Sequence, residues 1–409
     1  MERNGTIWKW SALAVAGTIA AAGPMMVPKS GSSPEAELAM GKTPIVAAVS
    51  AVKAESAAKS AETVLQAKAE IAAEPRVELT DAQRDSLAAE MNRWVTRHPR
   101  QLVDTIAELA ATQPLPLPPT YLLSIAWAET RGKILAVSPA GAAGLAQATP
   151  AAYLLEGFDG KLYVTNQYLI GTRAYIMKKP LGDAMTINDL LLKRNTPANR
   201  AKAKELLAHA VELRQEGMDE LEALRPVAND VFFAKIEQAD AHNRRTLEEL
   251  GRIIDRGAPR AQLQSFDKQV TREYRELMNL QRVSWARYGK QLESRRDALL
   301  KAKFGKDPVK VIQSNPYEAG EYLGEVLDAR FSPTKMATFL AAHLSTKQRQ
   351  ALELGAPADK VDEWTAALYN GGAVNLKRMQ AGLIGTLRET QKYMKLVPSR
   401  SEQLERSIG

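Results

Sequence analysis

The carboxyl group of Glu129 follows an apolar helical segment. Residues 121–129 read Tyr-Leu-Leu-Ser-Ile-Ala-Trp-Ala-Glu, and helical spacing places Glu129 on the same face as Leu122 and Ile125. Gly132 predicts that the helix ends within a turn of Glu129, so the negative end of the helix dipole lies near its carboxylate. Burial and the dipole both raise the pKa of a carboxylic acid. A carboxyl group that stays protonated near neutral pH is the general acid that cleavage of a glycosidic bond needs.

A segment of small residues comes next in the chain. Residues 135–147 read Leu-Ala-Val-Ser-Pro-Ala-Gly-Ala-Ala-Gly-Leu-Ala-Gln. Glycines such as Gly144 allow a bulky ligand to approach the backbone, and the hydroxyl of Ser138 and the amide of Gln147 can hydrogen-bond neutral sugar groups. A structural interpretation is also open, namely a glycine-rich turn before a helix with Ser138 as its cap.

These residues resemble a signature of the soluble lytic transglycosylase domain, a family with a lysozyme-like fold. Its members have a helix ending in Glu-Ser, then Ala-Val-Ser-Pro-x-Gly-Ala-x-Gly-Leu-Met-Gln, then a proline. The corresponding residues here are Glu129 and Thr130, the segment 136–147, and Pro150. Thr130 replaces the usual serine but keeps its hydroxyl. Ala146 replaces the methionine that contacts a sugar ring in the family, which leaves sugar affinity and subsite preference open.

Two later segments are similar to the other signatures of this family. Ala-Leu-Tyr-Asn-Gly-Gly, which contains Tyr369 and Asn370, resembles Ala-Tyr-Asn-Ala-Gly, and Glu-Thr-Gln-Lys-Tyr resembles Glu-Thr-x-x-Tyr. The resemblance implies that Tyr369 helps to position the catalytic Glu and the sugar. It also implies that Glu389 lies near a bound N-acetyl sugar and that Tyr393 closes the groove. The substrate-binding residues expected from it are Thr130, Ser138, Gly144, Gln147, Tyr369, Asn370, Glu389 and Tyr393.

The resemblance implies an activity, cleavage of the β-1,4 bond between N-acetylmuramic acid and N-acetylglucosamine in peptidoglycan. Glu129 would protonate the glycosidic oxygen, and the carboxylate that remains would take the proton of the C6 hydroxyl, which yields a 1,6-anhydro sugar. Most glycosidases use two carboxylates, whereas the motifs here offer one acid. Two alternatives stay open. One is a lysozyme-type hydrolase with Asp159 or Asp183 as the second acid, and the other is an inactive glycan-binding envelope scaffold.

The segments around these motifs predict a mainly α-helical protein. Thr80 and Gln83 have the spacing of a capping box, and helices are expected within residues 80–112. Alternating Pro and Leu at residues 114–119 form an extended segment, after which a helix begins near Thr120. This is the helix that carries Glu129 to its end.

The chain between the first and second signatures is longer than a minimal domain of the family needs, so an insertion is expected. We predict a lysozyme-like transglycosylase domain over residues 80–182 and 309–398, interrupted by residues 183–308. The insertion is rich in Lys, Arg, Glu, Leu and Ala with helical periodicity. Breaks at a proline and at a Gly-Ala-Pro sequence predict three helices in an antiparallel arm.

The charges of this arm fit solvated helix faces. A sharper hypothesis is that the arm docks another protein of the envelope, of a secretion system or of a virion, or that it covers the glycan groove. The predicted contact anchors are its aromatic residues Phe232, Phe233, Tyr274, Trp285 and Tyr288.

The N-terminal segment has the layout of an export signal. Arg3 and Lys9 precede an apolar stretch at residues 11–27, so residues 1–29 are predicted to be a signal peptide or a membrane anchor. Residues 30–79, dominated by Ala, Ser, Lys and Glu, are predicted to form a linker. The protein is therefore expected to be exported, either periplasmic or anchored in the inner membrane facing the periplasm, or virion-associated if it is phage-encoded.

Composition excludes several other kinds of chemistry. The 409 residues contain no cysteine, which rules out disulfides, thiolate metal sites and cysteine nucleophiles. The four histidines fall in no metal-ligand spacing, so we expect no metal and no cofactor. The net charge of +8 favours an anionic partner such as a cell-wall polymer. We expect no nucleic-acid binding, because no recognised module accompanies this charge.

Overall fold

A computed structural model gives the fold of most of the chain. The predicted signal or anchor and nearly all of the predicted linker lie outside the described residues, in which the chain is mainly helical and forms no β-strand. Within the described residues, no helix combines the length and the hydropathy that a membrane-spanning helix requires. The structure describes residues 77–94, 96–112, 115, 117–305, 307–381 and 388–409.

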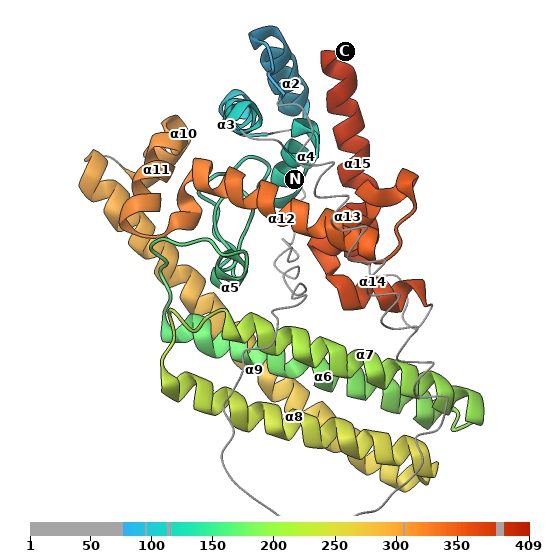
Figure 1. Cartoon of the computed structure of the whole chain (residues 1–409). Coiled ribbons are helices and arrows are strands. Elements are labelled where there is room, and N and C mark those ends of the chain that lie inside the picture. Colours follow the sequence, from blue (N-terminus) through green and yellow to red (C-terminus); the bar gives the residue numbers. More distant parts are fainter. Residues whose placement is uncertain (1–76, 95, 113–114, 116, 306, 382–387) are drawn as a thin grey trace, which may run out of the picture.

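Ten helices and two short 3₁₀ turns form what we call the body (Figure 1). Helix α15 packs along α4, α13 and α2, and α12 packs along α13 and α3. The helices of the body are α2 (Asp81–Arg93), α3 (Pro99–Thr112), α4 (Pro119–Thr130), α5 (Pro150–Leu155), α10 (Pro308–Ser314), α11 (Pro316–Val326), α12 (Pro333–Glu353), α13 (Val361–Gly371), α14 (Ala373–Gln380) and α15 (Arg388–Ile408), and the 3₁₀ turns are η1 (Ala329–Phe331) and η2 (Ala358–Lys360).

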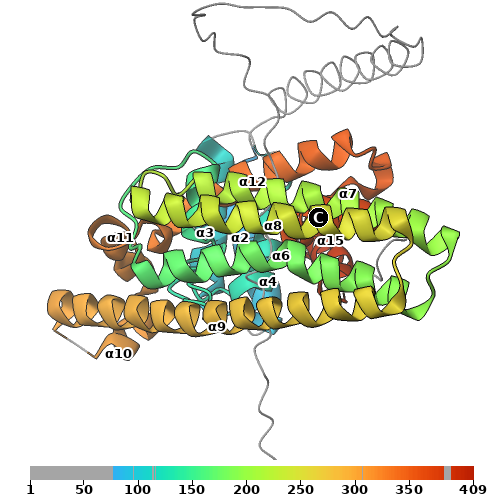
Figure 2. The same cartoon turned by 90° about the horizontal axis from the view of Figure 1, so that it is seen from below.

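Four long helices form what we call the arm, namely α6 (Asn166–Lys193), α7 (Pro197–Glu222), α8 (Asp230–Arg256) and α9 (Arg260–Phe304). Figure 2 shows them lying alongside one another, with α9 the longest. Helix α6 packs against the other three, and α7 contacts α5 and α14 of the body. In Figure 1 α9 runs from the far end of the arm to α10 and α11 at the side of the body.

The local signals that predict the first helices are confirmed. The capping box is present, because Gln83 N donates to Thr80 Oγ1 at 3.3 Å and Thr80 N donates to Gln83 Oε1 at 3.0 Å. Helix α4 begins at Pro119 and ends one residue after Glu129, as the sequence predicts. Arg131 takes a left-handed conformation there, with φ of 53°.

The insertion contains the three predicted helices α7, α8 and α9, and a fourth helix reaches into it. Gly257 ends α8 in a left-handed conformation, with φ of 61°. The predicted boundary at residue 183, however, falls inside α6, which continues through Pro180. A proline inside a helix removes one backbone hydrogen bond. Burial of Leu181 and Ile187 against α7, α8 and α9 stabilises α6 despite that loss.

The prediction that the aromatic residues of the arm are contact anchors is wrong for four of the five residues. Phe232, Phe233, Trp285 and Tyr288 are buried in the same apolar core as residues of the body. Trp285 Nε1 donates to Thr172 Oγ1 at 3.4 Å within the arm. Large aromatic side chains on these helices therefore join the arm to the body and are not exposed to a partner.

Candidate active site

The Glu129 carboxyl group lies at the end of α4 in an unusual environment. The residue is half-buried, and its Oε1 accepts a hydrogen bond from the Tyr393 hydroxyl. Its Oε2 is buried and has no hydrogen-bond partner among the described residues. Burial raises the pKa of Glu129 to about 8, while the hydrogen bond from Tyr393 lowers it and the negative charge of Glu389 raises it further. Glu129 therefore holds a proton at neutral pH, in the direction expected from the sequence.

Two tyrosines form a wall beside this carboxyl group. The ring of Tyr393 on α15 stacks on that of Tyr369 on α13, with centroids 6.4 Å apart and planes 11° apart. The Tyr369 hydroxyl donates to the backbone oxygen of Ala146 at 2.9 Å. Segments 264 residues apart in the chain, α4 and α15, thus meet at Glu129, and α13 joins them to the small-residue loop.

The third and second signatures are also linked to each other. Thr390 Oγ1 donates to Asn370 Oδ1 at 3.2 Å, and both residues are buried. A Cβ added at Gly371 would lie 2.9 Å from Thr390 Oγ1, so α13 and α15 approach closely at this point. Glu389 is exposed, and its charge acts on Glu129.

The side chains of the small-residue loop mostly bind the loop itself. Ser138 Oγ accepts from Ala142 N at 3.0 Å. Gln147, which has a positive φ of 48°, donates from Nε2 to the backbone oxygens of Gly144 at 3.0 Å and Ala136 at 3.3 Å. These bonds fix the backbone of the loop. Ser138 is not the helix cap that the structural interpretation predicted, because the next helix, α5, begins at Pro150 and is capped by Thr149.

Thr130 has a similar framework role. Its side chain is buried, and its Oγ1 donates to the backbone oxygen of Ala126 within α4 at 3.0 Å.

The structure brings together five of the predicted residues, Glu129, Tyr369, Asn370, Glu389 and Tyr393. It directs hydrogen bonds of the other predicted residues, Thr130, Ser138, Gly144 and Gln147, into α4 and the loop.

A buried ion pair that the sequence did not reveal holds the loop in place. Arg330 of η1 is fully buried and donates to both carboxylate oxygens of Asp328, at 2.7 and 2.9 Å. Its Nη1 donates to the backbone oxygens of Gly141 at 2.8 Å and Ala148 at 2.9 Å. A buried ion pair is stable when its remaining hydrogen-bonding groups are satisfied, as they are here. No local pattern marks these residues, because Arg330 lies 189 positions after Gly141.

The sequence also did not predict a hydrogen-bonded group of side chains next to Tyr369. His343 Nδ1 hydrogen-bonds Glu156 Oε1 at 2.6 Å, and Thr346 Oγ1 donates to Glu156 Oε2 at 3.1 Å. The His343 and Tyr369 rings form a T-shaped pair, with centroids 5.4 Å apart and planes 70° apart. Burial lowers the pKa of His343, so its imidazole is neutral. The spacing of His343 and Thr346 on one face of α12 is the signal that could have indicated this group.

The two candidates for a second catalytic acid lie in other settings. Asp183 forms an ion pair with Arg378 at 2.7 Å between α6 and α14. Asp159 is exposed in the segment after α5. The described residues include no cluster of three or more His, Asp or Glu side chains that could hold a metal ion. Glu129 is thus the one acid in this part of the chain for which the structure combines a raised pKa with the tyrosine wall.

Helices α4, α13 and α15 and the loop together place one protonated carboxyl group beside two stacked tyrosines. Comparison of the chain with protein-family models, with curated proteins and with solved structures finds no match.

Proposed function

We propose that the chain is a peptidoglycan lytic transglycosylase with a lysozyme-like catalytic domain, in which Glu129 is the single general acid and base. The observation that carries this proposal is the environment of the Glu129 carboxyl group. Tyr393 occupies its Oε1, and its buried Oε2 has no partner among the described residues. A protonated carboxyl group with a free oxygen can donate to the oxygen of a bound glycosidic bond.

In the first step Glu129 acts as the acid. Its proton goes to the glycosidic oxygen, the bond from that oxygen to C1 of the muramic sugar breaks, and the leaving sugar keeps the proton. The N-acetyl group of the same muramic sugar stabilises the positive charge that develops at C1. The Tyr393 hydroxyl donates to Glu129 and so stabilises the carboxylate that this step leaves.

In the second step the same residue acts as the base. The Glu129 carboxylate takes the proton of the C6 hydroxyl, and O6 forms a bond to C1, which gives the 1,6-anhydro sugar and restores the carboxylic acid. A pKa near 8 suits both steps, because the group is protonated before the reaction and is a competent base once ionised. Water takes no part as a nucleophile.

The replacement of the family methionine by Ala146 is compatible with this proposal. Ala146 contributes its backbone oxygen to the hydrogen bond with Tyr369, and that bond does not depend on the side chain. The proposal also includes export, because the predicted signal or anchor would bring the domain to peptidoglycan. The arm remains a proposed docking element for another protein of the envelope, of a secretion system or of a virion.

Mass spectrometry of fragments released from purified sacculi tests the proposal. We expect the full chain to release muropeptides with anhydro ends and the Glu129→Gln variant to release none. Glu402→Gln, an exposed residue of α15, is the matched control and should release as much as the wild type. Hydrated reducing ends would instead assign a lysozyme-type hydrolase. A folded wild-type chain that binds sacculi without releasing fragments would assign a glycan-binding scaffold.

A further inference from the structure

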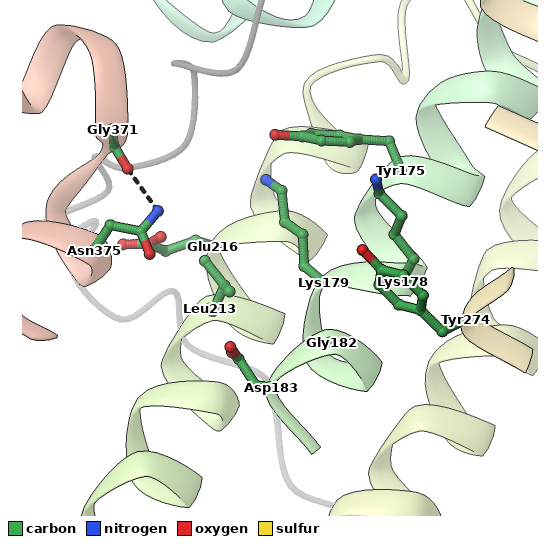
Figure 3. Close-up of a pocket in the computed structure, with 10 residues that line it drawn as sticks. All are labelled: Tyr175, Lys178, Lys179, Gly182, Asp183, Leu213, Glu216, Tyr274, Gly371 and Asn375. Carbon is green, nitrogen blue, oxygen red and sulfur yellow. Dashed lines mark hydrogen bonds between the residues drawn. The ribbon is translucent and has the colours of Figure 1, made fainter. Parts of the chain in front are cut away.

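A cavity of about 200 Å³ lies where the arm meets the body (Figure 3). Residues of α6, α7 and α9 line one part of it, and residues of α13 and α14 line the other. Figure 3 shows the two lysines of α6 below the Tyr175 ring and, across the cavity, Glu216 beside Asn375. The lining residues on which the argument depends are Tyr175, Lys178, Lys179, Glu216, Tyr274 and Asn375.

The ammonium group of Lys178 lies near two aromatic rings at this cavity. Its Nζ lies 5.5 Å from the centroid of Tyr175 and 5.9 Å from that of Tyr274, and it forms no ion pair with any described residue. Lys179 differs, because its Nζ lies 4.4 Å from the Tyr175 centroid and 3.6 Å from a carboxylate oxygen of Glu220. Lys178 is thus a cation at this cavity that forms no ion pair with a carboxylate of the described residues.

The nearby acids supply only part of the negative charge that would neutralise the Lys178 ammonium group. Asp183 forms an ion pair with Arg378 at 2.7 Å, and Glu220 forms one with Lys179 at 3.6 Å. Burial raises the pKa of Glu216 to about 7, so part of the population is neutral at neutral pH. Burial and the charge of Lys179 lower the pKa of Lys178, as expected for an ammonium group without a counterion. An uncompensated cation in a partly buried site favours an anionic ligand.

The position of the cavity connects it to the candidate active site. Gly371 lines the cavity, and it follows Tyr369 by two residues on α13. Tyr369 in turn stacks on Tyr393, which binds Glu129. Gly371 thus belongs both to the wall of the cavity and to the helix that carries Tyr369.

We propose that this cavity binds a carboxylate of the glycan strand, with Lys178 as the charge partner and the rings of Tyr175 and Tyr274 as its apolar walls. The inference rests on the proposed function and extends it, because it gives the arm a part in substrate recognition. Peptidoglycan offers this chemistry in two places, the lactyl carboxylate of a muramic sugar that carries no stem peptide and the carboxylates of the stem peptides. Both are carboxylates on an otherwise neutral glycan backbone.

Calorimetric titration of the full chain tests this inference, with Glu129→Gln as the background so that ligands stay intact. Three probes are used, namely a muramic-acid tetrasaccharide without stems, the same tetrasaccharide with stem peptides, and neutral chitotetraose. We expect Lys178→Gln to weaken binding of the acidic tetrasaccharides about tenfold, the effect of one charge-assisted hydrogen bond. Binding of chitotetraose should not change. A loss confined to the stem-free or to the stem-bearing probe identifies which carboxylate is bound.

Two further variants test whether an effect is specific to the charge at residue 178. Lys235→Gln removes an exposed charge from α8 and should leave binding of all probes unchanged. Lys178→Arg keeps the charge and should restore most of the affinity if the effect is electrostatic. Equal binding by Lys178→Gln and the background, or an equal loss for chitotetraose, would overturn the inference. Since anhydro products are scored separately with active enzyme, such a result would leave the proposed function standing.

Discussion

At the scale of single residues, two opposite influences act on the Glu129 carboxyl group. Burial favours the protonated form, and the hydrogen bond from Tyr393 favours the ionised form. Their balance leaves a group whose pKa of about 8 lies near neutral pH, which is where a residue that serves as acid and then as base is most effective.

This balance predicts the pH dependence of the proposed reaction. We expect the initial rate of anhydro-product release to be steady below about pH 8 and to fall above it, because only protonated Glu129 can begin the reaction. Tyr393→Phe removes the hydrogen bond that lowers the pKa, so the falling limb should move to higher pH. Rates measured from pH 5 to 10 would show this. Tyr322→Phe, on α11, is the matched control, and an unmoved limb in Tyr393→Phe would contradict the assignment of Tyr393.

The same pKa predicts a pH-dependent stability. Folded Glu129 keeps a proton up to about pH 8, whereas a carboxyl group with the ordinary value of 4.5 loses it earlier in the unfolded chain. The folded state therefore binds more protons between these values, and this group lowers stability as pH rises through them. Glu129→Gln removes that dependence. Its free energy of unfolding, relative to wild type, should rise by about 1–2 kcal/mol from pH 4.5 to 8.5, less than the full shift implies because the residue is half-buried.

Urea denaturation of both proteins at the two pH values measures this difference. The comparison across pH cancels the packing change that the substitution itself causes, because that change is present at both values. A difference that is the same at pH 4.5 and 8.5 would show that the pKa of Glu129 is not raised.

At the scale of helices and loops, the sequence predicts those features that depend on residues close together in the chain, such as the ends of helices. A capping box, a proline at the first turn and Gly132 after the last turn fix the ends of α2 and α4, and the end of α4 places Glu129. The ion pair of Arg330 with Asp328 could not be predicted in this way. It depends on contacts between distant parts of the chain, and hydrophobic periodicity carries no information about them.

The loop beside Glu129 offers a test with a matched glycine. Gly144 and Gly157 have nearly the same conformation, with φ of 75° and 76°, but differ in their surroundings. A Cβ at residue 144 would lie 1.8 Å from the backbone oxygen of Arg330, whereas residue 157 has nothing within 4 Å. We expect Gly157→Ala to cost about 1 kcal/mol of stability from backbone strain alone.

Gly144→Ala should cost considerably more, roughly 3 kcal/mol or above, because the loop must move away from η1. It should also reduce release of anhydro products from sacculi, since that movement displaces the backbone oxygen of Ala146 that holds Tyr369. Thermal unfolding and product analysis of the two variants give both quantities. Equal stability losses for residues 144 and 157 would contradict the close approach to Arg330.

At the scale of the whole molecule, the arm is less separate than its sequence indicates. Helical periodicity correctly predicts α7, α8 and α9, but it shows which residues are apolar and not which surface they cover. Trp285 and Tyr288 share a core with Leu135 of the body, so the arm and the site rest on common packing. Pro180 lies inside α6, the helix that links the two parts. Because proline ordinarily indicates a helix end, the sequence does not predict that this helix continues past it.

The contact between arm and body predicts a coupled loss of structure. Asp183→Asn leaves the buried Arg378 without its carboxylate, and we expect a loss of about 3 kcal/mol together with faster hydrogen exchange in both α6 and α14. Glu212→Gln, which removes the more exposed partner of Lys377 at 3.4 Å, should cost under about 1 kcal/mol. Denaturation and exchange mass spectrometry measure both effects. Faster exchange in α14 alone would show that the two parts are not coupled through this pair.

The length of α9 has a mechanical consequence. Its 45 residues form a rod of about 68 Å, since a helix rises 1.5 Å per residue. One end is at the tip of the arm, and farther along the rod the Tyr288 ring fills the space that a side chain at Gly141 would occupy, beside the loop. Such a rod can act as a lever: a load on the tip would exert a torque on the loop backbone at Gly141, so in the proposed transglycosylase pulling on the arm would change the rate of glycan cleavage.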